Sequence, residues 1–178
     1  NNGTSSVIDG CSNKSTIVGS SYNVGGICGH NNKGTVKNTA NNTGAIKGTY
    51  NVGGVCGKNE GGKITGGSSA ANILIEATST NSYVGGICGY NTGKMIASSY
   101  TGSSSNVKGV NYVGGVIGYN GSDSVKNFNA RSSSTVTATG NYVGGICGYN
   151  GGKLVGSNSY AVVSSTGSYV GGIVGTNA

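Results

Sequence analysis

The stretch Val24-Gly25-Gly26-Ile27-Cys28-Gly29 decides how this sequence is organised, because close copies of it return along the whole chain. The later copies are VGGVCG, VGGICG, VGGVIG, VGGICG and VGGIVG, and they begin at Val52, Val84, Val113, Val143 and Val170. Consecutive copies begin 28, 32, 29, 30 and 27 residues apart. A motif that recurs with a nearly constant period of about 29 residues predicts a stacked repeat protein.

The residues that flank the motif recur as well. A tyrosine lies one or two residues before the valine of every copy, at Tyr22, Tyr50, Tyr83, Tyr112, Tyr142 and Tyr169. An asparagine follows two residues after the last glycine of every copy, at Asn31, Asn59, Asn91, Asn120, Asn150 and Asn177. The repeat therefore indicates one domain over residues 1–178, with a partial repeat at 1–21 and further repeats that begin near residues 22, 50, 82, 111, 141 and 168.

The composition favours strands and turns over helices. Val, Ile, Thr, Ser, Tyr, Gly and Asn dominate, whereas Leu occurs only at Leu74 and Leu154. The 37 glycines come without any proline, which excludes a collagen helix. Only 34% of the residues are hydrophobic, but they fall at fixed places in each repeat, so a narrow core can form by stacking.

Each repeat carries three short apolar segments separated by Gly and Asn turns. The first is the VGG segment, the second lies five residues after each of the first five asparagines (Val36, Ile64, Ile96, Val125 and Val155), and the third is less regular. We expect an all-β fold, a single β-solenoid (parallel β-helix) of about six coils of roughly 29 residues, with three short strands per coil. A propeller or a sandwich is the rival architecture, but a propeller blade needs about 40 residues.

The cysteines follow the repeat. Four of them, Cys28, Cys56, Cys88 and Cys147, share one position that Ile117 and Val174 fill in the other copies. A position shared by Cys, Ile and Val is apolar, so we expect a ladder of buried free thiols rather than disulfides or a zinc site. The recurring asparagines are expected to form a second ladder at a corner, linked by their side-chain amides.

No catalytic constellation is apparent in the sequence. The four acids, Asp9, Glu60, Glu76 and Asp123, fall at four different places in the repeat, and the single histidine, His30, takes a turn position that is Lys or Tyr in the next four copies. Glycoside hydrolysis needs two carboxylates that face each other across a bond. The sequence therefore predicts a protein that is not an enzyme and that holds no cofactor or metal.

The formal net charge is +7, and the basic residues are spread singly. Lys33, Lys63, Lys94 and Lys153 recur before the second strand. A nucleic-acid surface concentrates its charge on one face, so we interpret these lysines as solvated and expect no nucleic-acid partner; weak attraction to anionic cell-wall polymers is the alternative. No apolar run reaches the roughly 20 residues of a membrane span, and no signal peptide is visible.

The tyrosines are the candidate binding surface. One ladder is expected from Tyr83, Tyr112, Tyr142 and Tyr169, and a second from Tyr90, Tyr119 and Tyr149. Two interpretations stay open: the rings stack only to stabilise the coils, or they form a flat aromatic strip for sugar rings or a partner protein. Host glycans, cell-wall polymers or proteins are the partners that this surface suggests.

The units of the form YVGGICGYN, followed by Gly-Lys-Ile and a Ser/Asn-rich return, resemble GLUG-type repeats of the form VGGLVGYN. The resemblance covers nearly the whole chain from Tyr22 onward, although most copies here have Ile-Cys or Val-Cys in place of Leu-Val. Such repeats occur in bacterial adhesins and in the non-catalytic regions of IgA-cleaving metallopeptidases, and the HExxH peptidase motif is absent here. The resemblance implies an extracellular or cell-surface bacterial β-solenoid that serves as a stalk or adhesive module.

Two alternatives to a stalk or adhesive module stay open, a self-assembling fibre and an enzyme. The chain starts in the middle of a repeat and ends after the first third of another, with no visible cap. It is therefore expected to be either a segment of a longer stalk or a subunit that self-associates head to tail into an extracellular fibre. The second alternative is a carbohydrate-active β-helix enzyme.

Overall fold

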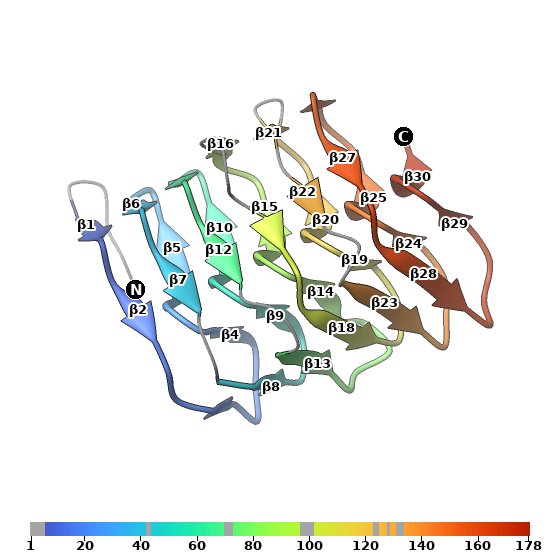
Figure 1. The fold of residues 1–178 in the computed structure, drawn as a ribbon, viewed down its shortest axis with the longest axis horizontal. Helices are drawn as coiled ribbons and strands as arrows, with labels where there is room; N and C mark the ends of the chain where they lie inside the picture. Colours follow the sequence, from blue (N-terminus) through green and yellow to red (C-terminus); the bar gives the residue numbers. More distant parts are fainter. Residues whose placement is uncertain are drawn as a thin grey trace.

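The chain forms a β-solenoid whose coils lie side by side along one axis (Figure 1). The computed structural model describes residues 6–41, 44–69, 73–96, 102–122, 125–127, 129–130 and 134–178. The first coil and the last coil lie at opposite ends of the long axis. Every strand pairs in parallel with the equivalent strand of the next coil, and the described residues contain no helix. This all-β solenoid with tandem coils confirms the predicted fold class.

Each coil contributes one strand to each of five sheets. The first sheet contains β1 (Val7–Asp9), β6 (Thr35–Lys37), β11 (Lys63–Thr65), β16 (Lys94–Ile96), β21 (Val125–Lys126) and β26 (Leu154–Val155). The second contains β2 (Ser12–Asn13), β7 (Ala40–Asn41), β12 (Ser68–Ser69), β17 (Gly102–Ser103), β22 (Asn129–Ala130) and β27 (Asn158–Ser159). The third contains β3 (Ile17–Val18), β8 (Ile46–Gly48), β13 (Leu74–Ala77), β18 (Asn106–Gly109), β23 (Thr135–Ala138) and β28 (Val162–Ser165).

The remaining two sheets are built from the VGG motif and the residues that follow it. The fourth contains β4 (Asn23–Gly25), β9 (Asn51–Gly53), β14 (Tyr83–Gly85), β19 (Val113–Gly114), β24 (Val143–Gly144) and β29 (Val170–Gly171). The fifth contains β5 (Cys28–Asn32), β10 (Cys56–Glu60), β15 (Cys88–Asn91), β20 (Ile117–Asn120), β25 (Cys147–Asn150) and β30 (Val174–Asn177).

The predicted number of strands per coil was wrong. The coil has five strands rather than three, because the VGG motif supplies two strands separated by a bend, and a two-residue strand of mainly small and polar residues forms the second sheet. The chain returns to the first sheet five times after β1 and then adds one strand to each of the other four sheets, so it completes five full turns and most of a sixth, close to the expected six.

The two glycines of the VGG motif are required for different reasons. A Cβ on the first, as at Gly53, would collide with the carbonyl oxygen of Cys56 in the same coil, because the chain bends there between the fourth and fifth sheets. A Cβ on the second, as at Gly54, would collide with the carbonyl oxygen of Gly86 in the next coil. Only glycine leaves room for such close backbone approach, so the motif encodes both the bend and the spacing of the coils.

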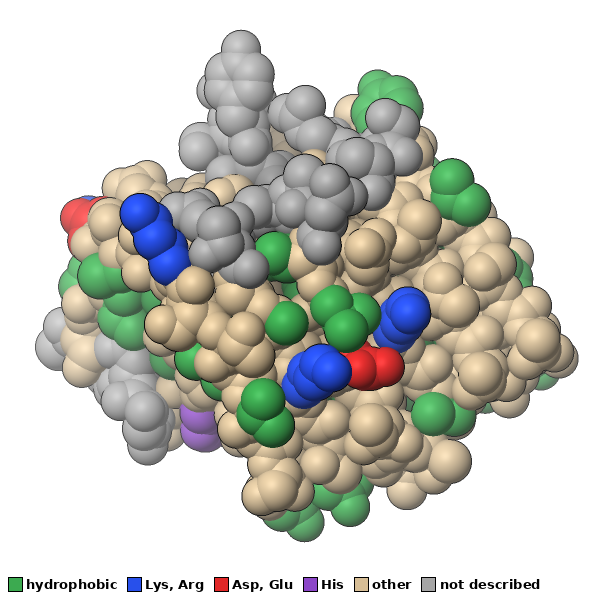
Figure 2. Space-filling model, turned by 60° about the horizontal axis from the view of Figure 1, so that its bottom comes forward, with side chains coloured by type: hydrophobic (Ala, Val, Ile, Leu, Met, Phe, Trp, Pro, Cys, Tyr) green, Lys and Arg blue, Asp and Glu red, His purple; other side chains and the backbone are tan. Residues whose placement is uncertain are grey.

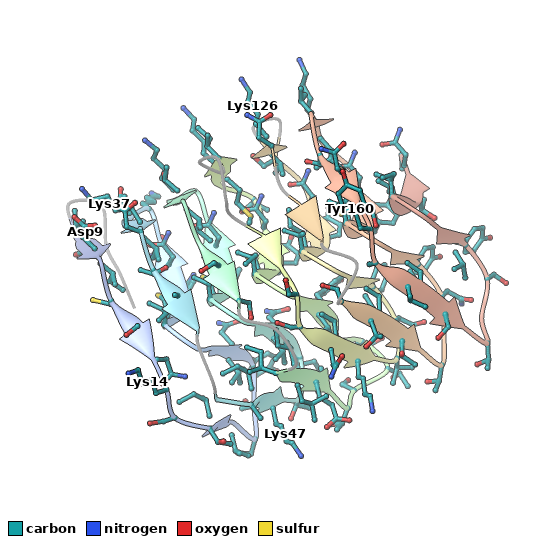
Figure 3. All side chains as sticks on the ribbon, viewed as in Figure 1. Asp9, Lys14, Lys37, Lys47, Lys126 and Tyr160 are labelled. Carbon is teal, nitrogen blue, oxygen red and sulfur yellow. The ribbon has the colours of Figure 1, made fainter. Side chains whose placement is uncertain are left out.

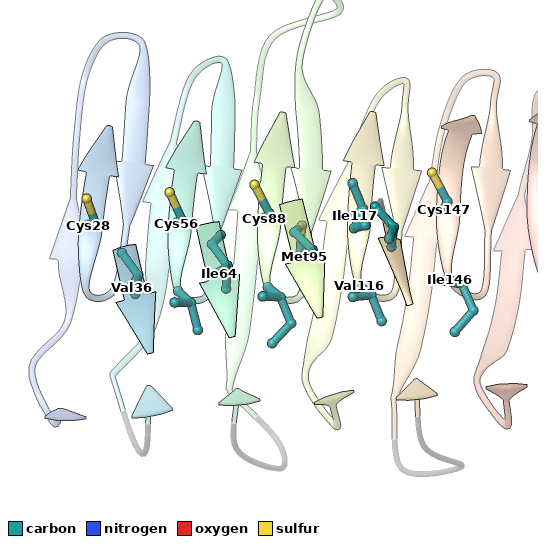
Figure 4. Packing of buried hydrophobic residues seen from close by; sticks show 13 residues of the cluster. Cys28, Val36, Cys56, Ile64, Cys88, Met95, Val116, Ile117, Ile146 and Cys147 are labelled. Carbon is teal, nitrogen blue, oxygen red and sulfur yellow. The ribbon is translucent and has the colours of Figure 1, made fainter. Parts of the chain in front are cut away.

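The apolar side chains fill the lumen in two clusters. One lies between the first and fifth sheets, where Val36, Ile64 and Met95 face the cysteine-bearing strands (Figure 4). The other lies between the third and fourth sheets and contains the valines of the first five VGG copies together with Ile46, Ile75, Val107 and Val136. Each side chain stacks on its equivalent in the neighbouring coil, so a chain with one-third apolar content still forms a continuous core.

Two of the β-branched residues that mark the second apolar segment, Ile96 and Val155, do not occupy the inward position. The structure pairs Ile64 with Met95 and Val125 with Leu154, and Met95 is fully buried whereas Val155 is exposed. In these two coils the turn after the asparagine is one residue shorter. The inward position therefore moves to Met95 and Leu154, each next to a β-branched residue that faces outward.

Candidate functional site

Seven tyrosines form a continuous strip along the outside of the fourth and fifth sheets. In the first ladder, ring centroids of consecutive members Tyr83, Tyr112, Tyr142 and Tyr169 lie 4.8, 4.7 and 5.1 Å apart. In the second, those of Tyr90, Tyr119 and Tyr149 lie 4.7 and 5.5 Å apart. Edge-to-face contacts with centroid distances of 5.3 to 6.1 Å join the two ladders. The structure thus brings together all seven tyrosines of the candidate binding surface.

The two ladders reach the surface by different local means. Tyr149 lies in the fifth sheet directly before the buried Asn150, so alternation between these two neighbours places its ring outside. Tyr112, Tyr142 and Tyr169 instead adopt the left-handed backbone region, with φ of 52°, 64° and 60°. That region is unfavourable for a residue with a large side chain and costs roughly 1–2 kcal/mol. The strain recurs in three successive coils.

The rings turn their faces toward one another rather than toward solvent. The planes of Tyr90 and Tyr119 are inclined by only 8°, and those of Tyr112 and Tyr142 by 12°. Stacked rings at these distances cover each other's faces, so ring edges and hydroxyl groups remain for a partner. This geometry disagrees with the idea of a flat platform for sugar rings, which requires open ring faces.

The strip also presents its phenol hydroxyl groups. Burial, followed by the neighbouring phenols, raises the pKa of Tyr83, Tyr112 and Tyr119 above the ordinary value, so these three stay protonated at neutral pH. Within the described residues, no hydrogen-bond partner is found for any of the seven hydroxyl groups. The strip is therefore a row of partly exposed hydroxyl groups, each able to donate and to accept a hydrogen bond.

The strip ends at a charged cluster on the first two coils. Lys58 occupies the register position of Tyr90 and lies 5.8 Å above its ring, in cation–π contact. Glu60 accepts from Lys58 at 2.9 Å and lies 2.9 Å from His30. A shallow pocket of about 240 Å³ opens at this junction, lined by Asn51, Lys58, Glu60, Tyr83, Tyr90 and Thr92. The tyrosines of the first coils, Tyr22 and Tyr50, form a separate stacked pair, because Asn51 rather than Tyr50 aligns with Tyr83.

The described carboxylates lie apart and each has a lysine partner. Asp9 lies 3.0 Å from Lys37 in the first sheet, and Glu76 lies 3.9 Å from Lys47 in the third. Lys58, and then His30, lower the pKa of Glu60. Asp123 lies outside the described residues. Among the residues that the structure describes, no cluster of three His, Cys, Asp or Glu side chains is present.

The six repeated asparagines form one amide ladder. The Nδ2 atom of each donates to Oδ1 of the next, with distances of 2.7, 2.7, 3.0, 2.7 and 2.7 Å from Asn31 to Asn177. Four of the first five also donate to a backbone carbonyl two or three residues ahead, as Asn59 does to Gly62. The Oδ1 atom of Asn31, at the start of the ladder, is buried and has no partner among the described residues.

The four repeated cysteines form a second ladder, in register with Ile117 and Val174 (Figure 4). All four are free and buried, and Sγ of Cys56, Cys88 and Cys147 donates to the carbonyl oxygen two residues ahead. Burial raises the pKa of Cys147 to about 12. Contact with Cys56, and then burial, raises the pKa of Cys28 well above its ordinary value. For Cys56, contact with Cys28 lowers the pKa, but contact with Cys88 and burial raise it by more, so the pKa of Cys56 lies well above its ordinary value.

The thiols should therefore differ sharply in reactivity. The fifth cysteine, Cys11, is free and exposed on the first coil, whereas the ladder cysteines are buried. We expect one thiol of the native protein to react rapidly with an alkylating reagent and four to react only after unfolding. Mass spectrometry of the labelled chain counts them, and Cys11→Ser should remove the rapid phase. Rapid labelling of more than one thiol, or a disulfide among the ladder cysteines, would contradict the ladder.

Comparisons with protein families, curated proteins and solved structures found no match for this chain. In the described part of the chain there is no helix of the length and apolarity that a membrane span needs.

The sequence interpretation missed one surface. The recurring lysines were interpreted as solvated and separate, but the structure places Lys33, Lys63 and Lys94 around one groove. The signal was available in the repeat itself, since each of these lysines lies next to a glycine.

Proposed function

We propose that the chain is a non-catalytic repeat module of an extracellular bacterial protein, with the tyrosine strip as its adhesive surface. The resemblance to GLUG-type repeats supports the extracellular setting. The observation that carries the proposal is the strip of seven partly exposed tyrosines along one side of a rigid solenoid. Strained backbone at Tyr112, Tyr142 and Tyr169 adds support, because such strain often persists where function requires it.

The geometry favours a protein partner over a stacked sugar. Tyrosine is enriched in protein interfaces because it offers a large, rigid contact area with one polar group. Here the available parts are ring edges and hydroxyl groups, which suit an extended polypeptide surface. A non-catalytic role agrees with the separation of Asp9, Glu60 and Glu76 on three different sheets.

The test is a binding assay against immobilised collagen, fibronectin and mucin. We expect wild-type protein to bind at least one of these, and the triple variant Tyr112→Ser/Tyr119→Ser/Tyr149→Ser to bind at least about tenfold more weakly, a loss of about 1.4 kcal/mol. The triple variant with Phe at the same positions keeps the stacked rings and removes only the hydroxyl groups, so its loss should be smaller.

The matched control is Tyr22→Ser/Tyr160→Ser, which changes two exposed tyrosines outside the strip. It should leave binding unchanged, and thermal unfolding should show that every variant is folded. Equal losses in strip and control variants, or no binding of wild type to any of the three proteins, would overturn the proposal. Turnover of a polysaccharide by the wild-type chain would instead support the enzyme alternative.

A further inference from the structure

A groove with a volume of about 510 Å³ runs across four coils beside the first sheet. Its lining contains three lysines, Lys33, Lys63 and Lys94, all of them exposed. Lys63 and Lys94 are register partners in adjacent strands β11 and β16, so their backbones lie about 4.8 Å apart. Lys153 continues the row two coils further on, where its N–H donates to the carbonyl oxygen of Ser122 on the groove wall.

The groove lysines differ in their electrostatic partners from three lysines elsewhere in the chain. Lys37, Lys47 and Lys58 each lie within 4 Å of a carboxylate, at 3.0, 3.9 and 2.9 Å. No ion pair is found for Lys33, Lys63, Lys94 or Lys153 in the described part of the structure. Lys108 and Lys126 also have no ion pair in that part of the chain, so the groove holds a share, and not the whole, of the unpaired positive charge.

The floor of the groove is open because glycines line it. Gly62 and Gly93 are buried between the exposed lysines, and a Cβ on either would collide with the amide ladder or with the neighbouring glycine backbone. Asn31 and Asn59 of that ladder donate to the carbonyl oxygens of Gly34 and Gly62 from beneath. The lysines thus lie beside a groove whose floor is glycine backbone, and the asparagines beneath the floor hydrogen-bond to that backbone.

We propose that this groove binds a linear acidic polysaccharide, with its carboxylates along the lysine row and its chain parallel to the solenoid axis. A polyuronate carries one carboxylate on every sugar, so successive sugars can each offer a carboxylate to the register partners Lys63 and Lys94. Each ammonium group has three donors and can bond a carboxylate and a hydroxyl of the same sugar. No aromatic side chain is among the described residues that line the groove, which disfavours single-stranded nucleic acid, because such ligands stack their bases on aromatic rings.

Binding of the intact chain to polygalacturonate tests this proposal. At about 50 mM salt, where exposed charges still interact over more than 10 Å, we expect measurable binding that weakens as salt is added. Lys63→Gln/Lys94→Gln should weaken it at least about tenfold. The control Lys47→Gln/Lys108→Gln removes the same charge from the third sheet and should change it less than about twofold. Figure 3 shows Lys47 at the opposite end of the coils from Lys37 and Lys126, which extend from the first sheet.

Three results would overturn the proposal. Equal weakening by both double variants would show diffuse attraction to net charge, and no binding at low salt would show that the groove holds no such polymer. Tighter binding of an oligothymidylate than of polygalacturonate would assign the groove to nucleic acid instead. Dextran, which is neutral, should not bind. The tyrosine variants leave this groove intact, so failure of the adhesive proposal does not decide this one.

Discussion

Gly145→Ala is expected to lower the free energy of unfolding by about 3 kcal/mol, the upper end of overpacking effects. A Cβ at Gly145 would collide with the carbonyl oxygen of Gly172 in the next coil and with the Ser159 hydroxyl group. Backbone atoms on both coils are fixed by the parallel hydrogen bonds of five sheets, so the coils cannot separate locally to make room. Chemical denaturation of wild type and variant measures the difference.

The repeat supplies its own control. Gly172 occupies the same motif position in the last coil, and a Cβ there meets nothing within 4 Å. Its φ is not in the left-handed region, so Gly172→Ala should be neutral or slightly stabilising, by up to about 0.5 kcal/mol, through the lower entropy of the unfolded chain. Similar losses for both variants would mean that the second glycine is needed for the bend of its own coil and not for the spacing of coils.

The sequence repeat was sufficient to predict the solenoid, because each copy of the motif reflects contacts made within its own coil and with the next one. The VGG motif is dictated by two close backbone approaches, and the position shared by Cys28 and Ile117 marks a lumen slot. The short strands of the second sheet, such as Ser68–Ser69, could not be predicted, because they carry no apolar alternation. Their pairing follows from the coils on either side rather than from their own sequence.

The one-residue shift at Met95 and Leu154 was equally hidden. Both neighbours, Ile96 and Val155, are β-branched, so a pattern based on β-branched residues selects them. The length of the preceding turn decides which of the two neighbours faces the lumen. That length is seen only in the pairing of β11 with β16 and of β21 with β26. A methionine adapts to the slot because its unbranched side chain fills irregular space.

For the candidate surface, spacing predicted which tyrosines align but not how the rings lie. Alignment depends on the repeat length, whereas ring orientation depends on backbone conformation at Tyr112 and its equivalents and on contact between the two ladders. In the face shown in Figure 2, backbone and side chains that are neither hydrophobic nor charged cover most of the surface, with only a few charged groups. Such composition gave no reason to expect that unpaired lysines gather along a single groove.

Equivalence of the coils can be tested by deletion, because the chain is a stack of units held in register by like residues. Removal of one complete coil, Tyr83 to Asn111, joins Ser82 to Tyr112 and places Val113 where Val84 had paired with Val52. Every remaining strand keeps an equivalent neighbour, so the shortened chain should fold. Its free energy of unfolding should be lower by roughly the contribution of one coil and one interface between coils. The matched control removes Tyr83 to Ile96, about half a coil, and leaves that coil without its strands in the fourth, fifth and first sheets.

Circular dichroism with thermal unfolding of these two deletion variants decides whether the coils are interchangeable. We expect a β-sheet spectrum and a single cooperative transition for the variant that lacks a whole coil, because its strands stay in register. We expect loss of that transition for the half-coil variant, because the interrupted coil leaves its neighbours without partners in three sheets. Equal behaviour of the two variants, whether both fold or both unfold, would contradict a solenoid built from equivalent coils in register.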